Sequence, residues 1–593
     1  MTPPSSRTRL PLDSLVQPKR TKRELPLGIA IRKALAGGYG KRELVADLFA
    51  GLVVGIVALP LSMALGIAVG APPQAGLYTA IIAGGLVALL GGCKFQVTGP
   101  TAAFVVILAP IVTRHGLSGL LTAGMMAGVI LVGMGIMKFG RLIQYIPYPV
   151  TTGFTTGIAV VIATLQIKDL FGLQLAAMPD HYTSKLQALW GARTGASLVE
   201  LGVAAVTLAC LLYVPKLTRR VPAPLIAIVG VSAGVALLAK LLPRFEPATI
   251  GSRFHTVVDG AAVGGIPQGL PRPALPWGSE FSFALVEDLL PAAFAIAMLG
   301  AIESLLSAVI ADGRTGKKHD PDAELIALGL GNLAAPIFGG IAATGALART
   351  ATNIRAGAKS PIAAIVHAAV VLLSVLLLGP LVAYVPMASL AALLIVVAYN
   401  MSEVRAFVGI VRVAPKSDVA VLITCFALTV LFDMVIAIAV GVVLAALLFM
   451  RRMAELTQSR AIFEGESTEH DVAVPHGVGL YEIRGPLFFG AAQKAMDALE
   501  AGRANSYDVL VLSLGSVSVI DATGLAALDN AIASLRRQNK RVVLAGPLPK
   551  PQRMFDKAGL DKRHRGLVFA PDLPAALAVA ATLVGPNLQA KGA

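Results

Sequence analysis

The sequence predicts an all-α polytopic membrane protein of about fourteen transmembrane spans in a 7+7 inverted repeat, followed by a C-terminal α/β domain. Three observations predict this fold class. Of the 593 residues, 56% are hydrophobic and 14% are charged, whereas soluble domains carry about 25% charged residues. Apolar runs of membrane-spanning length recur up to about residue 450. Beyond about residue 476, strand-like and helix-like patterns alternate.

The apolar runs divide into two matching sets. The runs long enough to span a bilayer lie at 46–70, 75–92, 118–137, 147–167, 197–214, 222–242, 289–311, 323–338, 361–378, 380–400, 418–432 and 434–450. Two shorter runs, at 99–113 and 346–357, each follow two long ones. We count them as spans because the basic connections then alternate between the two sides of the membrane. Seven spans in each set is an odd number, so the two sets have opposite orientations.

Each short run begins after an interruption of the same form. Gly91-Gly92 leads through a polar run to Thr98-Gly99-Pro100-Thr101, and Gly339-Gly340 leads to Thr344-Gly345-Ala346. Interrupted spans allow helices to begin within the membrane, where their N–H groups and positive dipole ends face an anion. The alternative is that the glycine pairs only let helices pack closely. We expect the first arrangement and interpret the chain as a carrier of a small anion.

Basic residues indicate the orientation. The net charge is +16, and Lys and Arg are concentrated in residues 1–44 and in alternate short connections. This positive-inside pattern predicts that both termini are cytoplasmic. Basic helix surfaces with interleaved aromatic residues are absent, so we expect no nucleic-acid partner. Residues 1–44 have no apolar core or cleavage site of a signal peptide, and the chain fits a bacterial inner membrane.

The remaining segments complete the predicted organisation. Polar stretches at 168–196 and 243–287 are expected on the outer face, and 402–413 is either a short amphipathic helix on the inner surface or a loop. The predicted domains are a basic tail (1–44), a transmembrane domain (45–455), a polar linker (456–475), an α/β domain (476–585) and a short tail (586–593).

Glu303 lies within the apolar run 289–311, with Ser307 four residues later on the same helix face. A charged side chain at the bilayer centre costs about 2.5–3.5 kcal/mol and therefore normally faces a cavity or a partner. An ionised Glu303 would repel an anionic substrate, whereas a protonated one would not. We therefore expect Glu303, with Ser307, to couple anion movement to a proton or another ion. The alternative role for Glu303 is a structural hydrogen bond to a neighbouring helix.

Arg349 follows the second interruption by about one helical turn. Its guanidinium could hold a carboxylate or sulfate with two hydrogen bonds; alternatively it pairs with an acid or extends to the membrane surface. Thr98, Thr101 and Thr344 could cap helices as well as contact substrate. His367, in an apolar run, is expected to be a packed, hydrogen-bonded histidine.

The sequence has no motif for an enzyme, a cofactor or a metal. Gly313-Arg-Thr-Gly316-Lys317 has the wrong spacing for a phosphate-binding loop, and no nucleophile elbow or zinc-ligand spacing is present. We expect neither ATP-driven pumping nor a bound cofactor.

These motifs resemble those of the sulfate permease (SulP) family of anion transporters over residues 45 to 585. The resemblance rests on Pro60-Leu-Ser-Met-Ala64, Thr98-Gly99-Pro100-Thr101, Ile266-Pro-Gln-Gly-Leu-Pro271, Glu324-Leu325 with Gly329 and Gly331-Asn332, and the Arg349 segment. Further segments are similar to a proton-driven transporter of four-carbon dicarboxylates within the family: Gly300-Ala-Ile-Glu-Ser-Leu-Leu306, Asn400-Met-Ser-Glu403 and Val430 to Ile438.

The resemblance implies core and gate helix bundles, an elevator-like motion, a homodimer and a cytoplasmic STAS domain with a protein partner. It implies proton-coupled symport of C4-dicarboxylates such as succinate, fumarate and aspartate, with Glu303 and Ser307 in ion coupling. The substrate would lie between the third and tenth spans. The implied substrate-binding residues are Leu61, Leu65, Thr98, Gly99, Pro100, Thr101, Gly345, Ala346, Leu347 and Arg349.

Three departures from the family pattern matter. Leu61 and Ala348 stand where many relatives have Gln and Ser, which makes the pocket less polar and suits a carbon-chain acid better than sulfate. Ala522 replaces the serine that is phosphorylated in related STAS domains, so Asp521 and Thr523 are read as helix caps.

Sodium- or exchange-driven movement of sulfate, bicarbonate or chloride remains an alternative, as does a membrane sensor that signals through the STAS domain.

Overall fold

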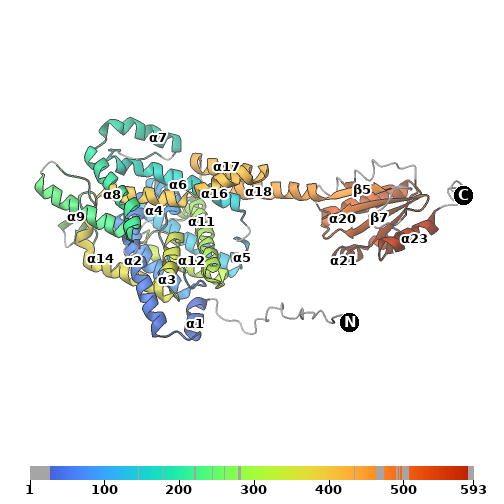
Figure 1. The fold of residues 1–593 in the computed structure, drawn as a ribbon, viewed down its shortest axis with the longest axis horizontal. Coiled ribbons are helices and arrows are strands. Elements are labelled where there is room, and N and C mark those ends of the chain that lie inside the picture. Colours follow the sequence, from blue (N-terminus) through green and yellow to red (C-terminus); the bar gives the residue numbers. More distant parts are fainter. Residues whose placement is uncertain are drawn as a thin grey trace, which may run out of the picture. The chain divides into compact units, whose positions relative to one another are not determined.

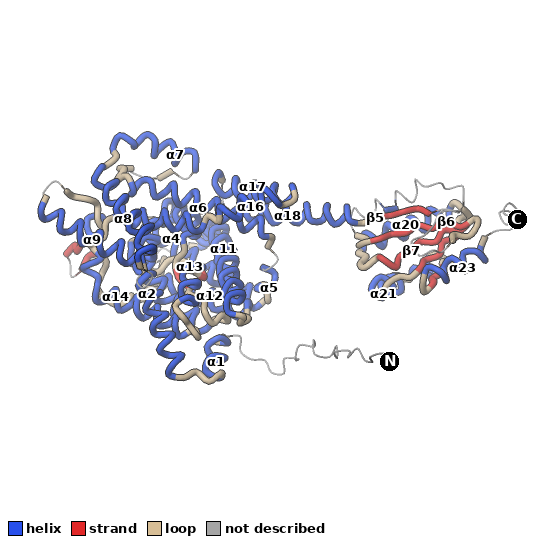
Figure 2. The backbone as a smooth tube through the Cα atoms, viewed as in Figure 1, coloured by secondary structure: helices blue, strands red, loops and turns tan. Residues whose placement is uncertain are grey.

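The computed structural model describes residues 27–143, 146–175, 178–179, 181–218, 222–242, 245–258, 261–277, 282–432, 434–462, 473–488, 492, 495–496 and 507–584. The chain divides into two compact units, Met1–Gly441 and Val442–Ala593. Figure 1 shows the helices of the first unit and the sheet of the second, and Figure 2 shows the same division by type of secondary structure.

Two groups of helices build the first unit. The core group comprises α2 (Lys41–Val69), α3 (Pro73–Leu90), α4 (Ala102–Ile136), α11 (Phe283–Thr315), α12 (Pro321–Ile337), α13 (Leu347–Arg355) and α14 (Ile362–Val382). Within it, α4 packs on α11 and α12, while α2 packs on α3 and α14. The two halves of the sequence thus interlock in one bundle.

The second group, the gate group, comprises α6 (Tyr148–Leu170), α8 (Leu198–Leu217), α9 (Ala223–Leu241), α15 (Met387–Met401), α17 (Lys416–Leu431) and α18 (Met434–Leu456). Its contacts run from α17 to α6, from α6 to α15, and from α15 through α8 to α9. Gly441 places α18 against Cys425 of α17 and Val150 of α6. The two groups touch where α4 meets α6 and where α2 meets α15.

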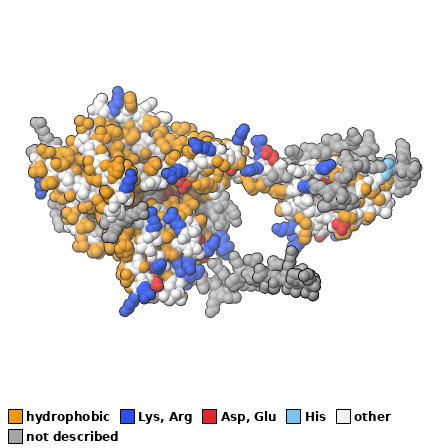
Figure 3. Space-filling model, viewed as in Figure 1, with side chains coloured by type: hydrophobic (Ala, Val, Ile, Leu, Met, Phe, Trp, Pro, Cys, Tyr) orange, Lys and Arg blue, Asp and Glu red, His pale blue; other side chains and the backbone are white. Residues whose placement is uncertain are grey.

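Ten helices of the described chain are long and apolar enough to cross a membrane. Their outward faces are apolar too, as the exposed Leu212 of α8, Leu237 of α9 and Leu377 of α14 illustrate. In Figure 3, hydrophobic side chains cover much of the visible surface of the helical unit, and Lys and Arg are fewer there. Such a surface is the one that lipid requires.

The observed helices follow the predicted spans, with the largest shift at 380–400, where α14 extends to Val382 and α15 begins only at Met387. Gly116 has non-helical backbone angles (φ 65°, ψ −170°) and divides α4 into segments 102–115 and 117–136, which correspond to the separate runs predicted at 99–113 and 118–137. Counting α4 twice, fourteen helical segments match the fourteen predicted runs; that each of them crosses a membrane stays a prediction. The amphipathic segment is also helical, as α16 (Val404–Val413).

Short elements occupy the connections. The N-terminal residues include α1 (Ile29–Ala36), and α5 (Gly140–Ile143) precedes α6. The stretch 168–196 contains α7 (Tyr182–Gly191) and the 3₁₀ helix η2 (Ala192–Gly195), and the stretch 243–287 contains α10 (Ile250–Arg253). An antiparallel hairpin of β2 (His255–Val258) and β3 (Ala261–Gly264) was not predicted.

The second unit is a five-stranded sheet in the order β5-β6-β7-β8-β9, in which only the β5–β6 pair is antiparallel. Its elements are β5 (Gln458–Ile462), β6 (Val478–Arg484), β7 (Val509–Ser516), α20 (Ala522–Arg537), β8 (Arg541–Ala545), α21 (Pro549–Ala558), α22 (Leu560–Arg563), β9 (Val568–Ala570) and α23 (Leu573–Leu583). One face packs on α20 and α21 and the other on α23. Asp521 caps α20 by accepting a 2.7 Å hydrogen bond from the N–H of Gly524, as predicted. One correction concerns 456–475: that stretch was predicted as a linker, but it contains β5, which pairs with residues 480–484 of β6.

Candidate functional site

The two interruptions meet in the core group. β1 (Thr98–Gly99) and β4 (Thr344–Gly345) form an antiparallel pair, with Thr98 opposite Gly345. The N–H of Ala346 donates to the carbonyl of Val97 at 2.9 Å. Helix α4 begins at Ala102 and α13 at Leu347, three and two residues after the ends of β1 and β4. The predicted meeting of two helix N-termini is therefore confirmed, and we call these paired residues the strand pair.

A buried carboxylate positions the first interruption. Glu324 of α12 accepts hydrogen bonds from the N–H groups of Gly92 and Cys93, at 2.8 and 2.9 Å, and from the side-chain amide of Gln96 at 2.8 Å. The same amide donates to Ser304 of α11 at 2.6 Å. The stretch between α3 and β1 is neither helix nor paired strand, so its backbone N–H groups lack regular hydrogen-bond partners. Where water is absent, they need other acceptors, and the carboxylate of Glu324 is one.

Asn332 has the corresponding role at the second interruption. Its side-chain amide donates to the carbonyl of Ala343 at 2.9 Å, and its oxygen accepts from the N–H of Ala343 at 2.8 Å. Thr344 donates to the carbonyl of Gly300 at 2.9 Å, which ties β4 to α11. Glu324 and Asn332 belong to the motif that resembles the family, but their role could not be predicted; the available signal was a polar residue inside an apolar run.

Glu303 lies next to the strand pair. It is 6% exposed, and one of its carboxylate oxygens accepts a hydrogen bond from the hydroxyl of Thr101 at 2.8 Å. Thr101 is the residue that precedes α4, so the carboxyl group is held at the N-terminal end of this helix. Among the described residues, no ion pair involves Glu303. Its charged form would therefore have only a hydroxyl and the helix end as partners.

Ser307 lies one turn farther along α11 but bonds elsewhere. Its hydroxyl donates to the hydroxyl of Thr350 on α13 at 3.1 Å, and that oxygen also accepts from the N–H of Val97 at 3.1 Å. The structure thus places Ser307 behind the strand pair, where it connects α11 to α13, and shows no hydrogen bond between it and Glu303.

Arg349 points from α13 into the strand pair. Its side chain is 2% exposed, and its guanidinium donates to the carbonyl oxygen of Pro100. A Cβ on Gly99 would lie 2.6 Å from Nη1, so the absence of a side chain there makes room for the guanidinium. In the part of the chain that the structure describes, Nε and Nη1 have no hydrogen-bond acceptor and no carboxylate forms an ion pair with them.

The other predicted site residues surround this centre. Gly345 and Ala346 are buried and Leu347 is half-buried at the start of α13; Leu65 is buried and Leu61 half-buried on α2, which packs against both α4 and α13. The hydroxyl of Thr98 is buried without a hydrogen bond among the described groups. His367 is also fully buried on α14, which agrees with the packed role predicted for it.

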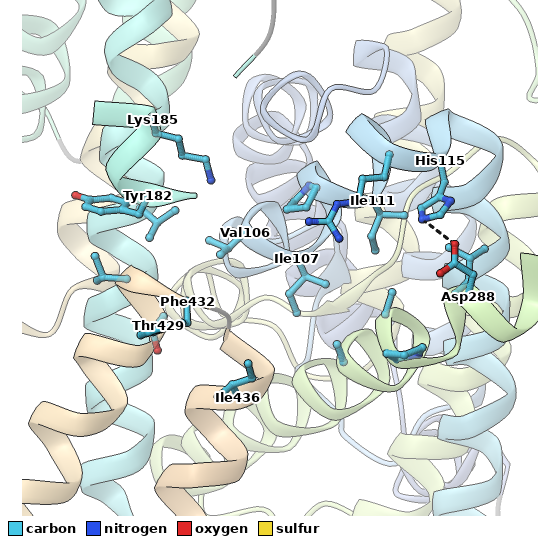
Figure 4. A pocket seen from close by; sticks show the side chains of 18 residues that line it. Val106, Ile107, Ile111, His115, Tyr182, Lys185, Asp288, Thr429, Phe432 and Ile436 are labelled. Atoms are coloured by element: carbon cyan, nitrogen blue, oxygen red, sulfur yellow. Dashed lines mark ion pairs between the residues drawn. The ribbon is translucent and has the colours of Figure 1, made fainter. Parts of the chain in front are cut away.

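Two cavities lie between the core and gate groups, toward opposite ends of α11. One, of about 510 Å³, is lined on α11 by residues from Asp288 to Ala295 (Figure 4). The other, of about 600 Å³, is lined on α11 by residues from Ile302 to Gly313 and on α6 by Tyr148 and Thr151. Glu303 directly follows Ile302, the residue of α11 at which the second cavity begins, and is itself part of neither lining.

Comparison with known proteins identifies the family. The family model described as "Sulfate permease family" matches residues 44–425, and the STAS domain model matches residues 469–571. The chain belongs to the sulfate permease family. It is an anion transporter of that family, and its apolar helices and bacterial relatives place it in a bacterial plasma membrane.

Sequence relatives cover nearly the whole chain. "Putative sulfate transporter YvdB" of Bacillus subtilis (strain 168) is 40% identical over 528 residues, which are 88% of this chain and 95% of that protein. "Bicarbonate transporter BicA" of a Picosynechococcus species is 30% identical over 542 residues, 88% of this chain and 92% of that one. The similarity of this family member to both therefore extends beyond the transmembrane domain into the STAS domain.

A solved structure shares the fold. The murine Solute Carrier 26 family member A9 anion transporter, in its inward-facing state, superimposes with a TM-score of 0.82, covering 98% of this chain and 100% of that one at 20% identity. At this identity the likeness concerns the fold alone. Among the described residues of this family member, no cluster of three or more His, Cys, Asp or Glu side chains could hold a metal ion.

Proposed function

We propose that this sulfate permease family member is a proton-coupled symporter of C4-dicarboxylates such as succinate, fumarate and aspartate. The observation that supports this most is the hydrogen bond between Thr101 and Glu303, because it puts a buried carboxyl group at the helix end where the anion would bind. The proposal includes an elevator-like movement of the core group against the gate group, for which the two cavities leave space.

Charge supplies the coupling. An anion at the strand pair would meet the N–H groups at the starts of α4 and α13 and the guanidinium of Arg349, all of which attract it. Ionised Glu303 would oppose the same anion through a poorly screened repulsion, and protonation removes that repulsion. Anion and proton therefore bind best together, which is the requirement for symport.

The dicarboxylate is favoured by two residues that the family resemblance assigns to the pocket. Leu61 and Ala348 provide no hydrogen-bonding side chain where many relatives have one, so a ligand with a hydrocarbon middle loses less there than sulfate would. Sulfate or bicarbonate is the second candidate, because these are the anions in the names of the relatives YvdB and BicA.

The test is uptake by purified protein in proteoliposomes. An imposed gradient, acid outside, should stimulate uptake of labelled succinate, and unlabelled fumarate and aspartate should compete better than sulfate, bicarbonate or chloride. If sulfate or bicarbonate competes best, the second candidate is correct.

The Glu303→Gln variant tests the coupling group. The amide keeps the shape and a hydrogen bond to Thr101 but cannot release a proton, so we expect loss of the response to the pH gradient while succinate–succinate exchange continues. Glu287→Gln, at an exposed position of the same helix, is the matched control. An unchanged pH response in Glu303→Gln would refute this assignment.

A further inference from the structure

The residues directly after α3 are held by other segments from two sides. The N–H of Gly28, which precedes α1, donates to the carbonyl of Leu90 at 2.7 Å. The N–H of Asp320, which precedes α12, donates to the carbonyl of Gly92 at 3.3 Å. A side chain on Gly92 would collide with the backbone of Asp320, so glycine permits this close approach. Helix α1 and the connection between α11 and α12 therefore meet at the start of the first interruption.

Each of these three segments carries a lysine. Lys33 is exposed on α1, Lys94 is half-buried in the connection after α3, and Lys317 is exposed between α11 and α12. Lys94 lies outside the predicted membrane spans, and its burial and the charges of Lys317 and Lys33 lower its pKa below the usual value for lysine. Lys94 is therefore close enough to both other lysines for their charges to act on it.

Acidic side chains of the same region hold the segments that carry the lysines. Glu324 accepts hydrogen bonds from two backbone N–H groups after α3, and Asp312 accepts one from the N–H of His319 at 3.0 Å. Asp320 caps α12 by accepting from two of its N–H groups at 3.2 and 3.1 Å. The backbone that carries the lysines is thus fixed by hydrogen bonds in which the lysine side chains take no part.

The positive-inside pattern alone does not explain this arrangement. It places basic residues in the connections on one side of the membrane, but it does not require three separate segments to present them at one point. Positive charges gathered in this way repel one another and disfavour the compact state. An anion bound among them removes that repulsion.

We propose that Lys33, Lys94 and Lys317 form a binding site for a phosphate-bearing anion, separate from the transport site. The ammonium group of lysine is a compact charge with three donors and commonly binds phosphate, whereas the planar arginine side chain suits a carboxylate better. Soluble pyrophosphate and anionic lipid headgroups both present this chemistry. The bound anion would join α1, the first interruption and the connection between α11 and α12, and the proposal requires neither the dicarboxylate nor the proton coupling.

Acetylation of lysines tests the site in the wild-type protein. The full-length chain in detergent is treated briefly with acetic anhydride at constant ionic strength, with increasing pyrophosphate, and mass spectrometry gives the rate at each lysine. Acetylation of Lys94 should slow, with saturation, by about tenfold when pyrophosphate is at about ten times its dissociation constant, because a bound ammonium ion is not nucleophilic. Lys216 and Lys416, exposed on other helices, are internal controls whose rates should not change.

Nanodiscs then distinguish the two sources of phosphate. The same reaction is compared in nanodiscs of phosphatidylcholine and in nanodiscs that also contain phosphatidylglycerol. Slower acetylation of Lys94 with phosphatidylglycerol, at unchanged Lys216 and Lys416, would show that a lipid headgroup occupies the site. Protection by pyrophosphate alone would show a soluble ligand. If neither slows acetylation of Lys94, or if the control lysines are slowed equally, the proposal is wrong.

Thermal unfolding provides a second measurement, with matched variants. Pyrophosphate should raise the unfolding temperature of the wild-type protein in detergent, because it binds the folded state. The shift should be much smaller in Lys94→Gln with Lys317→Gln and unchanged in Lys216→Gln with Lys416→Gln, which loses the same charge elsewhere. An equal shift in both double variants would place the bound anion at another site and would overturn the proposal, whatever the role of Glu303.

Discussion

Gly99 lacks a side chain at the point where the guanidinium of Arg349 passes. A Cβ there would come within 2.6 Å of Nη1, and the other near atoms belong to the same guanidinium group. The space beside β1 is therefore reserved for the positive charge. The same proximity gives Arg349 its contact with the carbonyl of Pro100, and leaves two of its nitrogens available for a ligand.

The Gly99→Ala variant should displace this charge while preserving the fold. The methyl group meets only the far end of a flexible side chain, so we expect Arg349 to move and the unfolding temperature to change little. Since hydrogen bonds to charged groups contribute about 1.5–3 kcal/mol, KM for the transported anion should rise about 10- to 100-fold.

Gly133→Ala provides the comparison for this measurement, because a Cβ at Gly133 meets no other atom within 4 Å. Both variants are compared with the wild-type protein for uptake kinetics and for thermal unfolding in detergent. A normal KM in Gly99→Ala would show that the position of the guanidinium does not matter for binding.

For single residues, the sequence predicted which ones are unusual but not which groups they form hydrogen bonds with. Glu303 and Arg349 stood out as charges within apolar runs. The partner of Glu303 is Thr101, which lies 202 residues away in the chain, and no periodic pattern carries that information. Ser307 was expected beside Glu303 from the helical spacing, yet its hydroxyl bonds to Thr350 because α13 packs against that part of α11.

Among the elements, α4 and α12, one from each half of the sequence, cross closely at two glycines. Gly128 and Gly329 face each other: a Cβ on Gly128 would be 2.8 Å from the carbonyl oxygen of Gly329, and a Cβ on Gly329 would be 2.7 Å from that of Gly128. Small residues let helix backbones approach in this way within membranes.

The Gly329→Ala variant should therefore separate α4 from α12. The added methyl group meets backbone atoms of Gly128 and Val132, which no change of rotamer can relieve. Overpacking of this kind costs about 1–3 kcal/mol, and the unfolding temperature in detergent should fall. Gly230→Ala on α9, where a Cβ meets nothing within 4 Å, should not lower it. Equal unfolding temperatures for the two variants would contradict the tight crossing.

Hydropathy predicted the boundaries of a helix correctly where the apolar stretch of sequence was long. The prediction of 222–242 and the observed α9 (Ala223–Leu241) differ by one residue at each end. The elements that were missed are short or depend on partners: β2 and β3 form a hairpin in a polar stretch, and β5 is a strand because β6 offers it an edge. A five-residue strand such as Gln-Ser-Arg-Ala-Ile has no internal alternation that would distinguish it from a linker.

For the whole molecule, the order of the elements followed from the sequence and their grouping did not. That the first half contributes α2, α3 and α4 to the core group, and α6, α8 and α9 to the gate group, is a matter of which helix faces are complementary. The resemblance to a known family implied this division into two bundles, and the packing confirms it. The sequence change near residue 476 marked the second unit, which forms its own core on both faces of its sheet.

The STAS domain should be dispensable for the transport step. All residues of the strand pair, Glu303 and Arg349 belong to the first unit, Met1–Gly441. A chain that ends after Leu456 keeps α18 complete and loses β5 to α23. Because the whole proposed binding site remains, we expect this truncated protein in proteoliposomes to retain uptake well above that of the Glu303→Gln variant.

The full-length chain and the same truncation carrying Glu303→Gln are the controls, and the amount of folded protein is matched by size-exclusion chromatography. If the truncated protein retains uptake but its uptake responds differently to added cytoplasmic factors, the STAS domain has a regulatory role. If the truncated protein binds the anion but moves none, the domain is required for the movement of the core group. If the full-length protein also binds without flux, the chain acts as a sensor and not as a carrier, because binding energy at the strand pair would then be used for signalling alone.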